Sequence, residues 1–177
     1  MNFSDLHENN LIEEAKVNAN AFSELYRRYV KKIYNYFCYR TSDIADAEDL
    51  TSQTFERVLK NIKSFEVKVS FNAWIFKISR NLLIDFYRKR KIEIEIENVQ
   101  LSFNKDYLKE LDQKETLERL FRQVNKLPDE QRETILLKYK HSFSNQEIAQ
   151  VLGKSEGAVK QLAHRALKKL KREIKRD

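Results

Sequence analysis

Residues 144–162 read SNQEIAQVLGKSEGAVKQL, which predicts two short helices joined by a tight turn. Ser144 and Glu147 have the spacing of a capping box, in which each side chain bonds the backbone N–H of the other residue, so they open the first helix. Gly153 supplies the positive φ that the turn needs, and Ser155 caps the second helix. The apolar residues that pack the two helices together are Ile148, Leu152, Val159, Leu162 and Ala163. The stretch predicts a helix-turn-helix, with an ordinary helical hairpin as the alternative.

The second helix of this motif continues with a buried stripe and a basic outer face. In a helix-turn-helix this helix lies in the DNA major groove. Residues 154–176 contain nine lysines and arginines against two glutamates, an excess expected for contact with phosphates. A solvated face that complements the helix dipole is the alternative. The expected buried stripe is Ala166, Leu167, Leu170 and Ile174. The expected DNA contacts are Ser155, Lys160, Gln161, His164, Arg165 and Lys168.

The composition favours an all-α fold made of two small helical domains joined by an acidic linker, the C-terminal one containing the helix-turn-helix. Only two glycines and one proline occur in 177 residues, which leaves few sharp turns. The net charge of +7 points to a polyanionic partner, with nucleic acid as the leading candidate. Cys38 is the only cysteine, which excludes an intrachain disulfide and a multi-cysteine metal site. We expect no metal and no cofactor.

The sequence carries no sign of export or membrane insertion. The first ten residues lack the basic and then apolar pattern of a signal peptide, and no apolar stretch approaches membrane-spanning length. A single cysteine also fits a reducing compartment. We therefore expect a cytoplasmic protein.

Two long helices are predicted in the first part of the chain. Apolar residues at steps of three and four from Phe22 to Phe37 form one broad stripe along the first of these helices. The second should begin near Thr41 or Ser42, with an inner side listed as Ala47, Leu50, Thr54, Phe55, Val58, Leu59 and Ile62. Its outer side carries acidic and amide groups, namely Asp46, Glu48, Asp49, Gln53 and Glu56. This acidic ridge is either a solvated helix face or a docking surface for a basic partner.

A third helix follows the connecting stretch 64–70, and its expected core positions include Trp74, Ile75 and Ile78. Its remaining face combines cations, an amide and an aromatic ring in Lys77, Arg80, Asn81, Tyr87 and Arg88. Such a face suits single-stranded nucleic acid, because rings stack on bases while cations follow the backbone.

The charge reverses in the middle of the chain, where residues 93–133 contain eleven acidic against seven basic residues. Residues 92–97 alternate strictly between isoleucine and glutamate, which predicts a short extended segment within a linker. Helical periodicity resumes at Leu108, and Pro128 starts a further helix that contains Ile135, Leu136 and Tyr139. The expected domains are 11–92, a linker over 93–112, and 113–177.

Several motifs, in order and spacing, resemble the group IV, or extracytoplasmic-function, sigma factors of bacterial RNA polymerase over nearly all of residues 20–172. The segment DAEDLTSQTF at 46–55 is similar to the part of that family's first domain that docks on the polymerase clamp. Residues 71–88 resemble the part that captures the minus-ten promoter element and helps to open the duplex. Residues 127–133 and the helix-turn-helix resemble the second domain, which reads the minus-thirty-five element.

The resemblance implies partners and site residues. The partners are core RNA polymerase, through its largest-subunit clamp and its flap, promoter DNA, and in some members an anti-sigma factor. Docking on polymerase is implied for Asp46, Glu48, Asp49, Leu50, Gln53 and Phe55. DNA contacts in the first domain are implied for Phe71, Trp74, Lys77, Arg80, Asn81, Tyr87 and Arg88. After Lys160 many members carry a small residue and then arginine, whereas Gln161 and Leu162 stand here, so base preferences do not carry over.

Two other functions compete with a sigma factor that has no catalytic chemistry of its own. A stand-alone helix-turn-helix regulator would bind operator DNA as a dimer and needs a dimerisation seam, which the sequence does not suggest. An enzyme acting on nucleic acid would need a cluster of catalytic groups. The three histidines, His7, His141 and His164, are scattered, and the chain has no glycine-rich phosphate loop.

Overall fold

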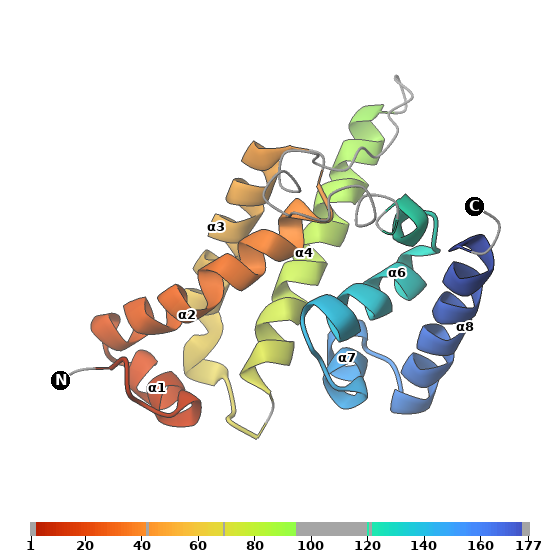
Figure 1. The fold of residues 1–177 in the computed structure, drawn as a ribbon. Coiled ribbons are helices and arrows are strands. Elements are labelled where there is room, and N and C mark those ends of the chain that lie inside the picture. The colour runs from red at the N-terminus through yellow and green to blue at the C-terminus, as the bar shows by residue number, and fades with distance from the viewer. Residues whose placement is uncertain (1–2, 42, 69, 95–119, 121, 175–177) are drawn as a thin grey trace, which may run out of the picture. The chain divides into compact units, whose positions relative to one another are not determined.

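A computed structural model describes residues 3–41, 43–68, 70–94, 120 and 122–174, and all regular structure in those residues is helical. The chain divides into two compact units, residues 1–104 and 105–177 (Figure 1). The predicted all-α architecture in two helical bodies is thereby confirmed. The expected linker over 93–112 lies almost wholly outside the described residues, as does the periodic segment from Leu108 to Leu117.

The N-terminal unit is built around the long helix α2 (Ala19–Cys38), which the apolar stripe predicted. Asn18 caps it, because its side-chain oxygen accepts hydrogen bonds from the backbone of Asn20 and Ala21. The side chains that α2 buries are Ala21, Leu25, Tyr29, Ile33, Tyr36, Phe37 and Cys38. Burial raises the pKa of the Cys38 thiol, which makes it an unreactive core group.

Helix α3 (Ile44–Asn61) begins later than the sequence predicted. Its cap is Asp43, whose carboxylate accepts from the backbone N–H of Ala45 at 2.8 Å. Thr41 is instead a buried connector, and its hydroxyl bonds the carbonyls of Phe37 and Asp43. The prediction that Leu59 faces inward is also wrong, since the side chain is 56% exposed. The buried stripe runs through Thr51, Thr54 and Val58.

Helix α4 (Phe71–Ile94) follows the 3-10 turn η1 (Ile62–Ser64) and packs against α3 (Figure 1). The side chain of Ser70 caps it by accepting from the backbone N–H of Ala73. Residues 92–94 are helical, so the predicted extended segment is wrong there, and its remaining residues lie outside the described part. Where α3 and α4 meet, the buried hydroxyls of Thr54 and Ser79 lie 3.4 Å apart.

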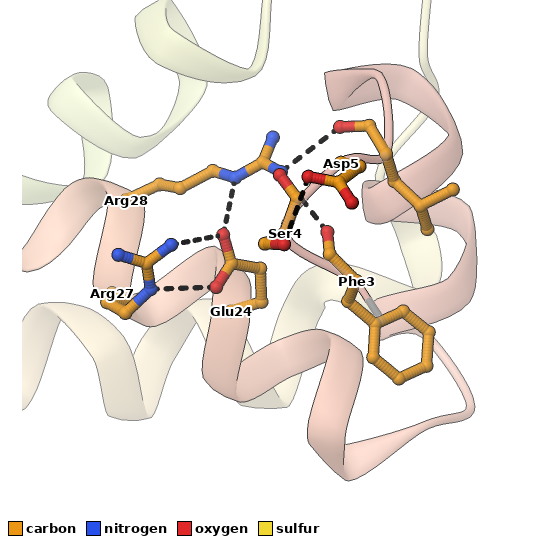
Figure 2. A network of polar contacts seen from close by, with 7 residues as sticks. Phe3, Ser4, Asp5, Glu24, Arg27 and Arg28 are labelled. Atoms are coloured by element: carbon orange, nitrogen blue, oxygen red, sulfur yellow. Dashed lines mark hydrogen bonds and ion pairs between the residues drawn. The ribbon is translucent and has the colours of Figure 1, made fainter. Parts of the chain in front are cut away.

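A short first helix, α1 (Glu8–Ala15), was not foreseen, and it packs on α2 through Leu11, Ile12 and Ala15. The segment before it is held by one side chain. Arg28 of α2 donates to the backbone carbonyls of Phe3, Ser4 and Leu6 at 3.2, 2.8 and 3.1 Å (Figure 2). The N-terminal unit therefore includes residues ahead of the expected boundary at residue 11.

Glu24 fixes the orientation of the arginine that holds this segment. Its carboxylate accepts two hydrogen bonds from Arg27, at 2.8 and 2.9 Å, and one from Nε of Arg28 at 2.9 Å (Figure 2). These bonds, those from Arg27 first, lower the pKa of Glu24 from 4.5 to about 2. Glu24 thus stays charged and keeps Arg28 aimed at the three carbonyls.

The C-terminal unit contains helical residues 122–125, α6 (Asp129–Ile135), the π-helical turn η3 (Leu136–Lys140), α7 (Asn145–Leu152) and α8 (Glu156–Ile174). Pro128 directly precedes α6, as predicted. Helix α8 packs against α6 and α7 (Figure 1). The buried cluster that joins α6, η3 and α8 is Val124, Leu127, Ile135, Leu136, Ala166 and Leu170.

The predicted helix-turn-helix is confirmed in its local details. Both hydrogen bonds of the capping box between Ser144 and Glu147 are present, and Gly153 has φ of 64°. The hydroxyl of Ser155 accepts from the backbone N–H of Ala158 at the start of α8. One expected core position is wrong, since Leu167 is 43% exposed. The buried stripe runs through Val159, Ala163, Ala166 and Leu170, and Leu167 lies one residue beyond it.

Substitution of the two glycines should separate backbone strain from packing. Nothing lies within 4 Å of a Cβ built on Gly153, so Gly153→Ala should lower the free energy of unfolding by about 1 kcal/mol through its positive φ alone. Gly157→Ala is the matched control, since it lies in helix α8 and its Cβ would lie 4.0 Å from Ser155 Oγ. It should be neutral or stabilising by up to about 1 kcal/mol. Urea denaturation measures both, and equal losses would contradict the assignment.

Replacement of Glu24 by glutamine should change how stability depends on pH. Because the pKa of Glu24 is lower in the folded state, its ionised carboxylate contributes its full stabilisation at pH values above the ordinary pKa of 4.5. This stabilisation is lost as the pH falls toward the folded-state pKa of about 2. Wild type should therefore be more stable than Glu24→Gln at pH 7, and the difference should shrink as the pH falls below 4.5. Chemical denaturation at steps from pH 7 to pH 3 measures the difference. A gap that stays constant across this range would mean that the carboxylate charge has no role in the network.

Candidate nucleic-acid and partner interfaces

Helix α8 brings five of the predicted DNA-contact residues to one exposed face. They are Lys160, Gln161, His164, Arg165 and Lys168. The opposite face of the helix is buried in the unit, so the packing fixes which side chains point outward. Ser155 is exposed as well, but its hydroxyl is used by the helix cap. The face therefore consists of cations and one amide on a rigid helix.

The donors on this face are largely available to a partner. Among the described residues, the side chains of Gln161, His164, Arg165 and Lys168 make no hydrogen bond or ion pair. Lys160 lies 2.9 Å from Glu156 one turn earlier, with both side chains at least half exposed. Such exposed pairs contribute little, so Lys160 can exchange the glutamate for a phosphate at small cost.

A second cationic face runs along α4 of the N-terminal unit. Lys77, Asn81, Ile84 and Arg88 are exposed at steps of four, three and four, which places them on one stripe of the helix. Arg80 and Trp74 lie half-buried beside it. Ile84 was not among the predicted contacts. The helical spacing of Ile84 from Lys77 and Arg88 is visible in the sequence, so this spacing could have identified Ile84 as part of the face.

Two residues predicted to contact DNA have contacts inside the unit. Phe71 is 2% exposed, and its ring lies 5.2 Å from Tyr29, 5.3 Å from Phe65 and 5.4 Å from Trp74. Tyr87 donates a hydrogen bond from its hydroxyl to the backbone carbonyl of Arg40. Phe71 anchors the connecting stretch against Trp74, and Tyr87 anchors α4 against the end of α2.

The acidic ridge on α3 is narrower than the sequence suggested. Glu48 and Asp49 are exposed, and Asp49 accepts from the amide of Gln53 at 2.6 Å. Leu50 and Phe55 are buried in the core, so they position the helix. Asp46 is half-buried and pairs with Arg90 of α4 at 2.9 Å. The exposed acidic residues of the ridge are therefore Glu48, Asp49 and Glu56, with Gln53 half-buried among them.

Apolar groups border this ridge. The ring of Tyr26 on α2 lies 4.5 Å from that of Phe55, and both Tyr26 and Leu59 are exposed. Glu56, the last acidic residue of the ridge, lies three positions before Leu59, and a hydrogen bond from Lys60 lowers the pKa of its carboxyl. An acidic ridge with an apolar border can combine charge attraction with burial of apolar area.

Two further sequence expectations can be compared with the described residues. No helix in that part of the chain combines the length and the apolar character needed to cross a membrane. Within the same residues, no three histidine, cysteine or carboxylate side chains lie close enough to hold a metal ion.

The chain is similar to known proteins in both units. The profile described as Sigma-70 region 2 matches residues 25–92, and that described as Sigma-70, region 4 matches residues 117–170. The first spans α2 to α4, and the second contains the helix-turn-helix.

The curated relatives include the ECF RNA polymerase sigma factor BldN of Streptomyces coelicolor. It is 35% identical over 172 residues, an alignment that covers 92% of this chain and 64% of BldN. The ECF RNA polymerase sigma factor SigW of Bacillus subtilis is 30% identical over 176 residues, covering 90% of this chain and 92% of SigW.

Solved structures agree with this assignment. CnrH in complex with the cytosolic domain of CnrY matches with a TM-score of 0.73 and 26% identity, over 95% of this chain and 97% of CnrH. The sigma factor RpoE of Bartonella quintana, in complex with the anti-sigma factor NepR, matches with a TM-score of 0.69 and 25% identity, over 88% and 98%. The chain therefore belongs to the extracytoplasmic-function family of RNA polymerase sigma factors.

Proposed function

We propose that this protein binds core RNA polymerase in the cytoplasm, directs it to specific promoters and helps to open the DNA there, without a catalytic step of its own. The observation that supports this most is the presence of two separate cationic helix faces, on α4 and on α8, each within one sigma region. A factor that must grip two promoter elements needs two such faces. Residues 11–92 serve polymerase docking and the minus-ten element, and residues 113–177 serve the minus-thirty-five element.

The α8 face suits duplex DNA. Arg165 and Lys168 can neutralise phosphates, which positions the helix, while Gln161 carries both a donor and an acceptor for base edges. His164 and Lys160 flank it on the same exposed side. Because the amide and the cations share one face, a single docking pose allows positioning and reading together.

The α4 stripe suits a strand that has left the duplex. Lys77 and Arg88 follow the backbone, and half-buried Trp74 offers ring surface for a base. Drawing a base out of the stack costs a few kcal/mol, which stacking and phosphate contacts can offset. Promoter opening is then the result of binding alone.

The α3 ridge is the proposed contact with the polymerase clamp, mainly through the exposed carboxylates of Glu48 and Asp49. The RpoE structure is a complex with the anti-sigma factor NepR, and we propose an anti-sigma factor for the present chain as well. A stand-alone dimeric regulator is not favoured, because it gives the α4 stripe and the region 2 match no role.

The docking proposal predicts a selective loss in Asp49→Asn. Removing an exposed charge from the ridge should weaken binding to core polymerase roughly tenfold, mainly because association becomes slower. The affinity should also depend less on the salt concentration. Glu14→Gln on α1, also exposed and acidic, is the matched control and should bind as wild type does. Fluorescence titration of labelled chain with core enzyme measures both. If wild type binds no core polymerase, or supports no initiation from a promoter library, the proposed function fails.

The α8 proposal predicts distinct behaviour for its cations. In holoenzyme, Arg165→Ala and Lys160→Ala should each weaken binding to all promoter sequences and lower the log–log salt slope by about 0.9 if the side chain contacts a phosphate. A side chain that contacts a base should instead relax preference at one position. Lys63→Ala, exposed on η1 of the other unit, is the charge-matched control. Unchanged affinity, slope and preference in both variants would remove this face from the DNA interface.

A further inference from the structure

Two polar contacts hold the last turns of α4 against the start of α3 and against the connection that precedes it. The guanidinium of Arg90 donates from Nη1 to Oδ2 of Asp46 at 2.9 Å, and the two side chains are only 35% and 28% exposed. Tyr87 donates to the carbonyl of Arg40, which lies in the connection between α2 and α3. Both contacts join residues more than 40 positions apart in sequence, 44 for Arg90 with Asp46 and 47 for Tyr87 with Arg40.

The contacts leave the DNA stripe of α4 free. Tyr87 and Arg90 are three residues apart, so they share one side of the helix, and the mean direction of this pair lies roughly a third of a turn around the axis from that of Ile84 and Arg88. The guanidinium of Arg90 also lies 5.6 Å from the ring centroid of Phe86, which helps to hold it in place. One side of α4 is thus fixed to α3 while the stripe stays open to solvent.

Asp46 differs from its neighbours on the ridge. Glu48 and Asp49 are exposed, and neither pairs with a residue of another helix among the described residues. Asp46 is half-buried, and its ion-pair partner, Arg90, belongs to α4. A partly shielded pair between helices is worth more than an exposed pair within one helix, and breaking it leaves a charge in a poorly hydrated place. Its carboxylate is therefore engaged before any partner arrives.

We propose that Asp46 and Arg90 form, with Tyr87 and Arg40, a clasp that sets the position of the α4 stripe relative to the docking ridge, and that Asp46 acts as a positioning residue for promoter opening. This inference rests on the proposed function of the two faces. It assigns Asp46 a role different from the polymerase contact that the family resemblance implies. Opening depends on the clasp because the strand must be gripped by α4 while the ridge of α3 is fixed on the polymerase.

A double-mutant cycle tests the clasp in holoenzyme. The variants are Asp46→Asn, Arg90→Gln and the two combined. Affinity for core polymerase is titrated, and opening is followed by 2-aminopurine fluorescence in the minus-ten strand of a promoter selected from the library. Each single variant should lower the open fraction roughly threefold to tenfold, with the double variant no worse than either single one, because the same interaction is lost each time. Core affinity should stay within roughly twofold of wild type, whereas Asp49→Asn should lower it.

Other outcomes would overturn the inference. Weaker core binding in Asp46→Asn but not in Arg90→Gln would make Asp46 a direct polymerase contact, and effects on opening that multiply in the double variant would mean that the two residues act separately. If a neutral variant fails to fold, Tyr87→Phe takes its place, because it removes the hydroxyl that donates to the Arg40 carbonyl, and unchanged opening in that variant would contradict the clasp. Failure of wild type to bind core polymerase would instead count against the proposed function. In that case, the same variants measured by urea unfolding would still give the interaction free energy between Asp46 and Arg90.

Discussion

The close packing of α3 against α4 is the constraint on which both faces of the N-terminal unit depend. At its centre the hydroxyls of Thr54 and Ser79 are fully buried, and each also bonds a carbonyl of its own helix, at 2.8 and 2.9 Å. Small side chains that satisfy their own polar groups let the two helices approach closely. The inner faces of α3 and α4 are therefore buried against each other, and the acidic ridge and the cationic stripe lie on their outer faces.

Local signals in the sequence predicted the cap and the turn of the helix-turn-helix, whereas they did not predict contacts between residues distant in sequence. The capping box at Ser144 and the turn at Gly153 depend on residues within four positions, so their spacing carries the structure. Leu59 and Leu167 were placed inside because they are apolar, yet apolar identity does not say which residue of an adjacent pair faces the core. The start of α3 was missed because Thr41 serves the connection between helices instead of a cap.

In the candidate sites, too, the features that depend on local spacing could be predicted and the contacts between distant residues could not. Most of the α8 face could be predicted, because a buried stripe at helical spacing leaves the basic residues outward. Phe71, Tyr87 and Asp46 were assigned to partners from residue type and resemblance alone, but each has an internal contact with a residue distant in sequence. Only the fold reveals that a side chain suited to a partner is already occupied.

The hydrogen bonds from Arg28 to the first residues affect which amino acids this segment tolerates. The arginine binds carbonyl oxygens, which every amino acid possesses, so the side chains of Ser4 and Leu6 contribute nothing to those bonds. Selection that preserves the attachment acts on residue 28 and on the carboxylate at residue 24 that orients it. The side chains at positions 4 and 6 can therefore change without loss of this attachment, whereas the buried ring of Phe3 is also held by packing.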